Sequence, residues 1–159
     1  MKKRLIYRNH RAITLHLVGL LTLAIPVYVI TMIFWDFEHF LSEFSSRNSG
    51  IAWAIFMITM SHGTLIAMLW LSGRYVLSIT ESDTRNETIE VKTWSFIGFY
   101  RTRYYPKSIL NNSQYNPGTG FYGRGPVVNA PWYQLKTPKG KTLVVDGKGD
   151  FFYQGKYQW

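Results

Sequence analysis

The chain has 159 residues, of which 18 are Lys or Arg and 9 are Asp or Glu, so its formal net charge is +9. It contains no cysteine, which excludes disulfide frameworks, thiol chemistry and the zinc or iron–sulfur sites built on thiolates. The excess of positive charge favours anionic partners, namely lipid headgroups, nucleic acid or acidic protein surfaces.

The chain begins with a basic segment followed by a long apolar run. Residues 1–12 carry several Lys and Arg and no acid, and they are predicted to form a water-facing tail. Residues 13–35 are predicted to form a first transmembrane helix, because roughly 20 apolar residues span a bilayer. This run is too long for a secretory signal peptide and no small-residue cleavage site follows it, so the helix is expected to be retained.

A connector over residues 36–50 separates this run from a second one. The aromatic and leucine residues at its start recur at helical spacing, which is typical of a short amphipathic helix on a membrane surface. These residues are Phe37, Phe40, Leu41 and Phe44. Residues 51–73 are predicted to form the second transmembrane helix.

The charges that flank the two apolar runs predict their orientation. Basic residues precede the first run and follow the second, whereas the connector holds Asp36, Glu38 and Glu43 against Arg47. The positive-inside rule therefore places both termini on the matrix side of a mitochondrial inner membrane, or on the cytoplasmic side of a bacterial inner membrane.

His62 lies near the middle of the second run, where ionisable residues are often functional. A shared haem ligand is disfavoured, because His16 in the first run would lie about 10 Å away in depth. The alternative is a histidine that is hydrogen-bonded to a neighbouring helix or to a backbone carbonyl. Gly63 and Ala67 have the spacing of small residues that allows another helix to approach closely. We therefore predict that His62, Gly63 and Ala67 contact a partner, either the first span or a helix of a larger complex.

From residue 74 onward the apolar residues alternate with a period of two, which indicates strands. Residues 74–146 are predicted to form a small antiparallel sheet of about five strands. Residues 107–131 are predicted to be a long loop, and residues 147–159 a Gly- and aromatic-rich tail that is ordered against a partner. The expected fold class is a membrane α+β protein, with a two-helix transmembrane hairpin followed by a small antiparallel β-sheet domain.

The motifs of the second half favour binding over catalysis. Residues 118–123 match the GxGxxG pattern, but the strand and the helix that dinucleotide binding needs are absent around them. Residues 100–105 interleave tyrosine and arginine, which suits an exposed sheet face, an anionic lipid or protein, and, least of all, nucleic acid. No nucleophile, P-loop or metal-ligand spacing is present. We therefore predict a protein that is not an enzyme, holds no cofactor or metal and binds no nucleic acid.

Two closely spaced spans followed by the segments RYVLSIT and IEVKTWSFIG resemble the mitochondrial transmembrane protein 70/186/223 family. The later YQLK and LVVDG stretches resemble the closing hairpin of that family. The resemblance implies a membrane hairpin with a matrix β-rich domain, and a role in the assembly of ATP synthase, complex I or cytochrome c oxidase. The matching positions are Tyr75, Val76, Ile79, Val91, Thr93, Phe96, Gly98, Tyr133, Leu135, Leu143, Asp146 and Gly147.

These observations lead us to expect a non-catalytic accessory subunit of a mitochondrial inner-membrane respiratory complex. The alternatives are an assembly factor for such a complex and an anionic-lipid-binding membrane protein. Aromatic residues and arginine are favoured at protein interfaces, and partner contacts are predicted at Phe121, Tyr122, Trp132, Phe151, Phe152, Tyr153 and Trp159. Binding of an anionic lipid such as cardiolipin is predicted at Arg4, Arg8, Arg11 and Arg74.

Overall fold

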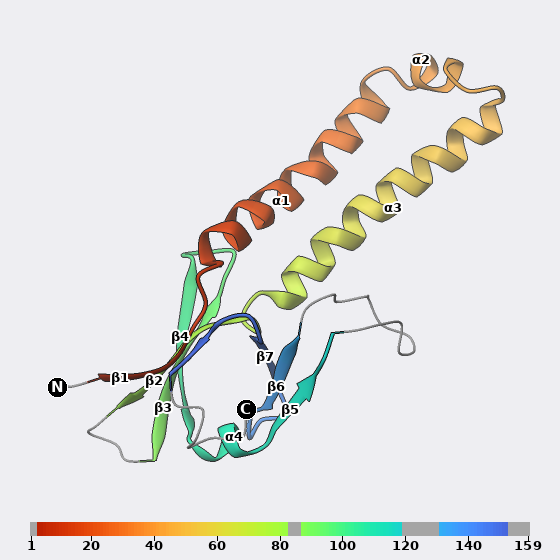
Figure 1. Ribbon diagram of the computed structural model, residues 1–159. Coiled ribbons are helices and arrows are strands. Elements are labelled where there is room, and N and C mark those ends of the chain that lie inside the picture. Colours follow the sequence, from red (N-terminus) through yellow and green to blue (C-terminus); the bar gives the residue numbers. More distant parts are fainter. Residues whose placement is uncertain (1–2, 83–86, 119–130, 153–159) are drawn as a thin grey trace. The chain divides into compact units, whose positions relative to one another are not determined.

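The computed structural model describes residues 3–82, 87–118 and 131–152 (Figure 1). The chain divides into two compact units. One is the helical unit, His16–Trp70, and the other, the sheet unit, combines Met1–Leu15 with Leu71–Trp159. Each unit has a cluster of buried apolar side chains of its own.

The two long apolar helices and the short connector helix are confirmed. They are α1 (Ala12–Trp35), α2 (Phe37–Ser42) and α3 (Arg47–Leu71). α3 begins four residues earlier than the expected Ile51, because the Ser46 hydroxyl accepts a hydrogen bond from the Ser49 backbone N–H at 3.2 Å. A serine in this position satisfies one of the free N–H groups of the first turn and so fixes the start of the helix.

The core of the helical unit is small and lies around α2. Val29 and Ile33 of α1 pack with Phe40 and Leu41 of α2 and with Ala54 of α3. Most other apolar side chains of the two long helices are exposed. The helices therefore bury one end of their hairpin and leave most of their length uncovered within the described residues.

The sheet unit contains two antiparallel sheets in place of the single sheet that was expected (Figure 1). The five-stranded sheet has the order β4-β3-β2-β1-β8, and the three-stranded sheet has the order β5-β6-β7. The strands of the first sheet are β1 (Lys3–Arg8), β2 (Val76–Ser82), β3 (Thr88–Trp94), β4 (Tyr100–Pro106) and β8 (Asp150–Phe151). Those of the second sheet are β5 (Ser113–Asn116), β6 (Trp132–Lys136) and β7 (Thr142–Asp146).

The prediction that residues 1–12 form a water-facing tail is wrong for β1. This strand lies between β2 and β8 and pairs with both. The register shifts between Leu5 and Tyr7, and this irregularity allows the successive residues Ile6 and Tyr7 to be fully buried. Two buried side chains of this size contribute a few kcal/mol of burial free energy, so this basic segment is part of the core.

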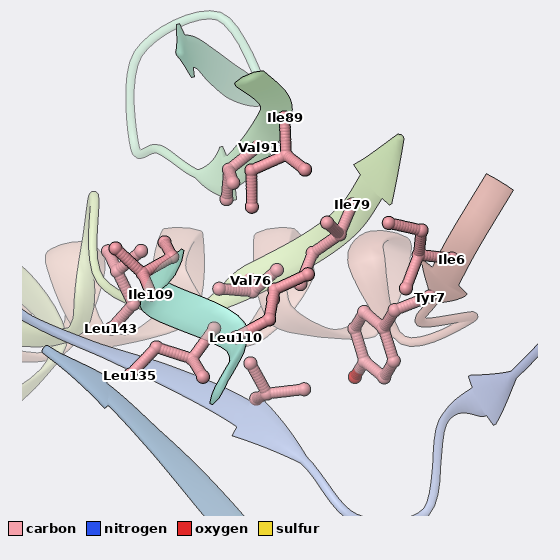
Figure 2. Close-up of a cluster of buried hydrophobic side chains, with 11 residues drawn as sticks. Ile6, Tyr7, Val76, Ile79, Ile89, Val91, Ile109, Leu110, Leu135 and Leu143 are labelled. Atoms are coloured by element: carbon pink, nitrogen blue, oxygen red, sulfur yellow. The ribbon is translucent and has the colours of Figure 1, made fainter. Parts of the chain in front are cut away.

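The core of the sheet unit lies between the two sheets (Figure 2). Apolar side chains of β2 and β3 meet those of β6 and β7, and the short helix α4 (Ser108–Asn111) adds Ile109 and Leu110. The buried members are Ile6, Tyr7, Val76, Ile79, Ile89, Val91, Ile109, Leu110, Leu135, Leu143 and Val145.

Two other expectations for this half are corrected. α4 and β5 form within residues 107–131, where a long loop was expected, because Ile109 and Leu110 are buried against the core. Asp150–Phe151 of the expected tail forms β8 on β1, so this part is ordered by the chain itself. The strands β2, β3, β4, β6 and β7 pair antiparallel within residues 74–146, so the antiparallel strands expected there are confirmed.

Candidate functional site

Four basic residues from three parts of the sheet unit lie near one another, and we call them the basic cluster. They are Arg74, Arg101, Arg103 and Lys141. Arg101 and Arg103 of β4 pair in register with Thr93 and Val91 of β3, so they share one face of the sheet. Val91 belongs to the core, so this is the face that meets the second sheet.

Backbone contacts bring Arg74 and Lys141 to the same place. The Val144 N–H of β7 donates to the Arg74 carbonyl at 2.8 Å, which joins the segment after α3 to the second sheet. A Cβ atom placed on Gly73 would lie 3.4 Å from Nζ of Lys141, so this ammonium group lies against the residue before Arg74. Residues far apart in the sequence therefore form one cationic surface.

The basic cluster is electrostatically unfavourable on its own. Burial lowers the pKa of Lys141, and the positive charges of Arg103, Arg74 and Arg101 lower it further. Among the described residues, the side chains of Arg101, Arg103 and Lys141 form no ion pair. A bound anion would relieve this repulsion, so the arrangement suits anion binding.

An apolar turn between β3 and β4 lies beside the basic cluster, and we define it as residues 95–99. Ile97 is 81% exposed and Phe99 is 54% exposed. The Ser95 N–H donates to the Phe99 carbonyl at 3.1 Å, and Gly98 and Phe99 have φ angles of 76° and 60°. Such a backbone is sparsely populated by residues other than glycine, so the turn holds Phe99 in a conformation of raised energy.

Hydrogen bonds tie this apolar turn to the end of α3. The Gly73 N–H donates to the Trp94 carbonyl at 2.7 Å, and the Phe96 N–H donates to the Ser72 hydroxyl at 3.4 Å. Ser72 directly follows the last residue of α3, Leu71. The apolar turn is therefore next to the point at which the chain leaves the second long helix.

A buried polar network joins the segment before α1 to the segment after α3 and to the end of β7. The Asp146 carboxylate accepts from the Tyr75 hydroxyl and from the Lys148 N–H, each at 2.8 Å, and lies 3.4 Å from a guanidinium nitrogen of Arg11. The Asn9 amide donates to the hydroxyl groups of Tyr7 and Tyr75, at 3.2 and 3.0 Å. Burial raises the pKa of both phenols, and the Asp146 charge adds to this effect.

The predicted lipid-binding arginines do not all converge. Arg4 lies opposite Glu81 in the β1–β2 register, five residues beyond Val76 and so about 17 Å along the strand. Arg11 precedes α1 and lies against Asp146, whereas Arg74 belongs to the basic cluster. Arg4 and Arg8 lie along an extended strand, so the four arginines do not form one cluster, and lipid binding at them stays a prediction.

The predicted partner residues of α3 lie on a largely open helix. Nδ1 of His62 donates to the Ile58 carbonyl at 2.8 Å, which agrees with the hydrogen-bonded interpretation. Gly63 has no atom within 4 Å of the place where a Cβ would lie. Ala67 is exposed, so the Gly63 and Ala67 surface is uncovered within the described chain.

The predicted aromatic contacts have different outcomes. Phe151 packs against the unit's own core, with its ring 5.0 Å from Tyr7 and 5.5 Å from Tyr133, and its contact with a partner stays a prediction. Trp132 is half-buried on β6, and Phe152 is exposed. The positions Phe121, Tyr122, Tyr153 and Trp159 lie outside the described residues.

Lys141 was missed by the sequence analysis. Its only local feature is its place after the turn of residues 137–140, and its neighbours in the basic cluster are between 38 and 67 residues away in the chain. In the described ranges, no group of three or more His, Asp or Glu side chains could hold a metal ion. Comparisons with protein-family models, curated proteins and solved structures found no match.

Proposed function

We propose that the protein is a membrane-anchored, non-catalytic accessory protein of a larger membrane complex. The observation that carries this proposal is the exposed apolar surface of α1 and α3. Both helices are long and apolar enough to cross a membrane, and only 22% and 11% of their most apolar windows are buried. Lipid, or the helices of other membrane proteins, would cover such a surface.

The charges around the helices favour a single orientation of the hairpin. Arg11 precedes α1, and Arg74 follows α3 after two residues, whereas the connector contains three acids and Arg47. By the positive-inside rule, the sheet unit would face the matrix of a mitochondrion or the cytoplasm of a bacterium. The resemblance noted in the sequence favours the mitochondrial inner membrane.

The accessory role is inferred from surfaces that suit binding. Gly63 and Ala67 leave an open strip on α3 that another helix could approach closely. The sheet unit presents exposed aromatic residues, among them Tyr100, Tyr104 and Tyr115. We propose a structural subunit of a respiratory complex as the first candidate and an assembly factor as the second.

The test has two stages, and both use native membranes. Membranes washed with alkaline carbonate should retain the chain, whereas a released chain would contradict anchoring. Extraction with a mild detergent and blue-native electrophoresis should then place the chain at the mass of one mature respiratory complex. Comigration only with immature intermediates would favour the assembly factor, and migration only at the chain's own mass would contradict both roles.

Binding of anionic lipid is a second candidate function, favoured by the basic cluster. The side chains of Arg74, Arg101, Arg103 and Lys141 come together in the sheet unit, and Arg74 follows the end of α3 after two residues. The phosphate groups of acidic lipids such as cardiolipin would offset the mutual repulsion of these cations.

A further inference from the structure

We propose that the apolar turn and the basic cluster form one docking surface for an anionic lipid bilayer, with Ile97 and Phe99 inserted at the headgroup boundary and the cations bound to lipid phosphates. This inference rests on the proposed anchoring of α3. It differs from the arginine set expected from the sequence, because it keeps only Arg74 of that set and adds the turn, Arg101, Arg103 and Lys141.

Two hydrogen bonds set the depth of the apolar turn relative to the end of α3. Phe96 is hydrogen-bonded to Ser72, one residue after α3 ends, and Trp94 is hydrogen-bonded to Gly73. If α3 spans a bilayer, these residues lie at its surface, because an apolar helix of this length ends near the headgroups. The apolar turn must then lie at the same depth as the end of the helix.

The composition of the turn suits that depth. Turns that face water are usually made of Gly, Asn, Asp, Ser and Pro, whereas this one contains Phe96, Ile97 and Phe99. Exposed apolar groups beside basic ones are typical of protein segments that lie in the membrane interface. The first residue of β4, Tyr100, is also half-exposed, and tyrosine is enriched at that boundary.

The charges next to the turn complement an anionic leaflet. Arg101 follows Phe99 by two residues, and the ammonium group of Lys141 lies against Gly73. At a membrane surface rich in acidic lipids, each nearby Lys or Arg raises the binding affinity by about fivefold. Phosphate oxygens would also offset the mutual repulsion of the basic cluster.

The experiment uses the full chain in nanodiscs and takes advantage of the absence of cysteine. Ile97→Cys and Tyr104→Cys are each labelled with a nitroxide, and both original side chains are exposed on the sheet unit. Discs contain phosphatidylcholine alone or phosphatidylcholine with cardiolipin. We expect the Ile97 label to be accessible to oxygen, as in lipid, in the cardiolipin discs, and the Tyr104 label to remain accessible to aqueous nickel chelate in both.

The charge contribution is tested with matched lysines. Lys141→Gln, in the Ile97→Cys background, should lower the ratio of lipid-inserted to aqueous label by about fivefold. Lys139→Gln removes an exposed lysine two residues away and should leave that ratio unchanged. Equal effects of the two substitutions would overturn the role of the basic cluster.

A third label separates this inference from the proposed anchoring. Leu23 is exposed on α1, so a nitroxide at Leu23→Cys should report a lipid environment if the helices span the disc. A lipid-embedded Leu23 label with an aqueous Ile97 label would overturn the docking surface alone, whereas an aqueous Leu23 label would overturn both. Shielding of Ile97 only in native membranes would assign the surface to a protein partner and overturn the lipid assignment.

Discussion

Asp146 joins four parts of the sheet unit through its buried carboxylate and its backbone carbonyl. It accepts from Tyr75 at the start of β2 and from Lys148 after β7, and it faces Arg11 before α1. Tyr7 of β1 donates to its backbone carbonyl at 3.1 Å. Because these groups all bond to the same buried residue, a shift of one of them disturbs the hydrogen bonds of the others.

This network predicts a loss of stability at high pH. The folded state raises the pKa of Tyr7 and Tyr75, so above about pH 10 the unfolded chain loses these protons first and is favoured. Each tyrosine should lower the free energy of unfolding by up to about 1.4 kcal/mol per pH unit in that range. Thermal unfolding in detergent between about pH 8 and about pH 11 measures the slope.

Tyr75→Phe should make this decline shallower, because it removes one of the two buried phenols. The control is Tyr104→Phe, which alters an exposed residue and should keep the wild-type slope. An unchanged slope in Tyr75→Phe would show that its phenol does not stay protonated in the folded state.

For single residues, the sequence predicts the face of a strand on which a side chain lies better than it predicts which distant residues surround that side chain. Alternation along β4 correctly puts Arg101 and Arg103 on one face, because strand geometry is local. It does not reveal Lys141, whose neighbours depend on how β7 pairs with the segment after α3. Such pairings between distant segments have no signature in a single sequence.

β1 is the element that most changes the expected architecture. Its basic residues are typical of a segment that flanks a transmembrane helix. Its apolar residues Leu5, Ile6 and Tyr7 form too short a run for the alternation of a strand to be recognised. It is a strand because β2 and β8 supply its partners from the second half of the chain. The pairings of β2 with β3 and of β6 with β7 were predictable, since the two strands of each pair are neighbours in the sequence.

Ile6→Ala tests whether β1 belongs to the core. Ile6 is fully buried, so the substitution should destabilise the sheet unit by about 2 to 5 kcal/mol. The matched control Ile97→Ala changes an exposed isoleucine of the same unit and should cost less than about 0.5 kcal/mol. Near-ultraviolet circular dichroism during heating in detergent compares the two, and equal melting temperatures would contradict the placement of β1.

At the scale of the whole molecule, assembly with other proteins can be separated from folding at Gly63. The site is open in the described chain, so Gly63→Ala and Gly63→Leu should leave the free energy of unfolding unchanged or raise it by up to about 1 kcal/mol, the gain in helix propensity. Gly63→Leu should nevertheless reduce comigration with a larger complex on blue-native gels, because a bulky side chain keeps a partner helix away.

Gly63→Ala is the matched control, because alanine keeps the surface small while it gives the same gain in helix propensity. It should assemble as the wild type does. Normal assembly of Gly63→Leu would remove this strip of α3 from the interface.

The number of sheets could not be predicted from the sequence either. Alternation identifies strands but not the sheet to which each belongs, and the second sheet depends on β5, whose four residues lie in a stretch rich in Asn and Gly. The core that joins the sheets also uses Ile109 and Leu110 of α4, a helix too short to give a periodic pattern.

The ladder between β1 and β2 also restricts how the chain can be threaded through a membrane. β1 ends four residues before α1, β2 begins five residues after α3, and Arg8 pairs with Ser78. Two strands can bond only when both are in the same aqueous compartment. A chain that crossed the bilayer once, or lost its first helix to a processing peptidase, would separate β1 from β2 and leave the sheet without one of its interior strands. The sheet can therefore form only if the chain crosses the membrane an even number of times between β1 and β2. An error in membrane insertion would prevent the sheet unit from folding.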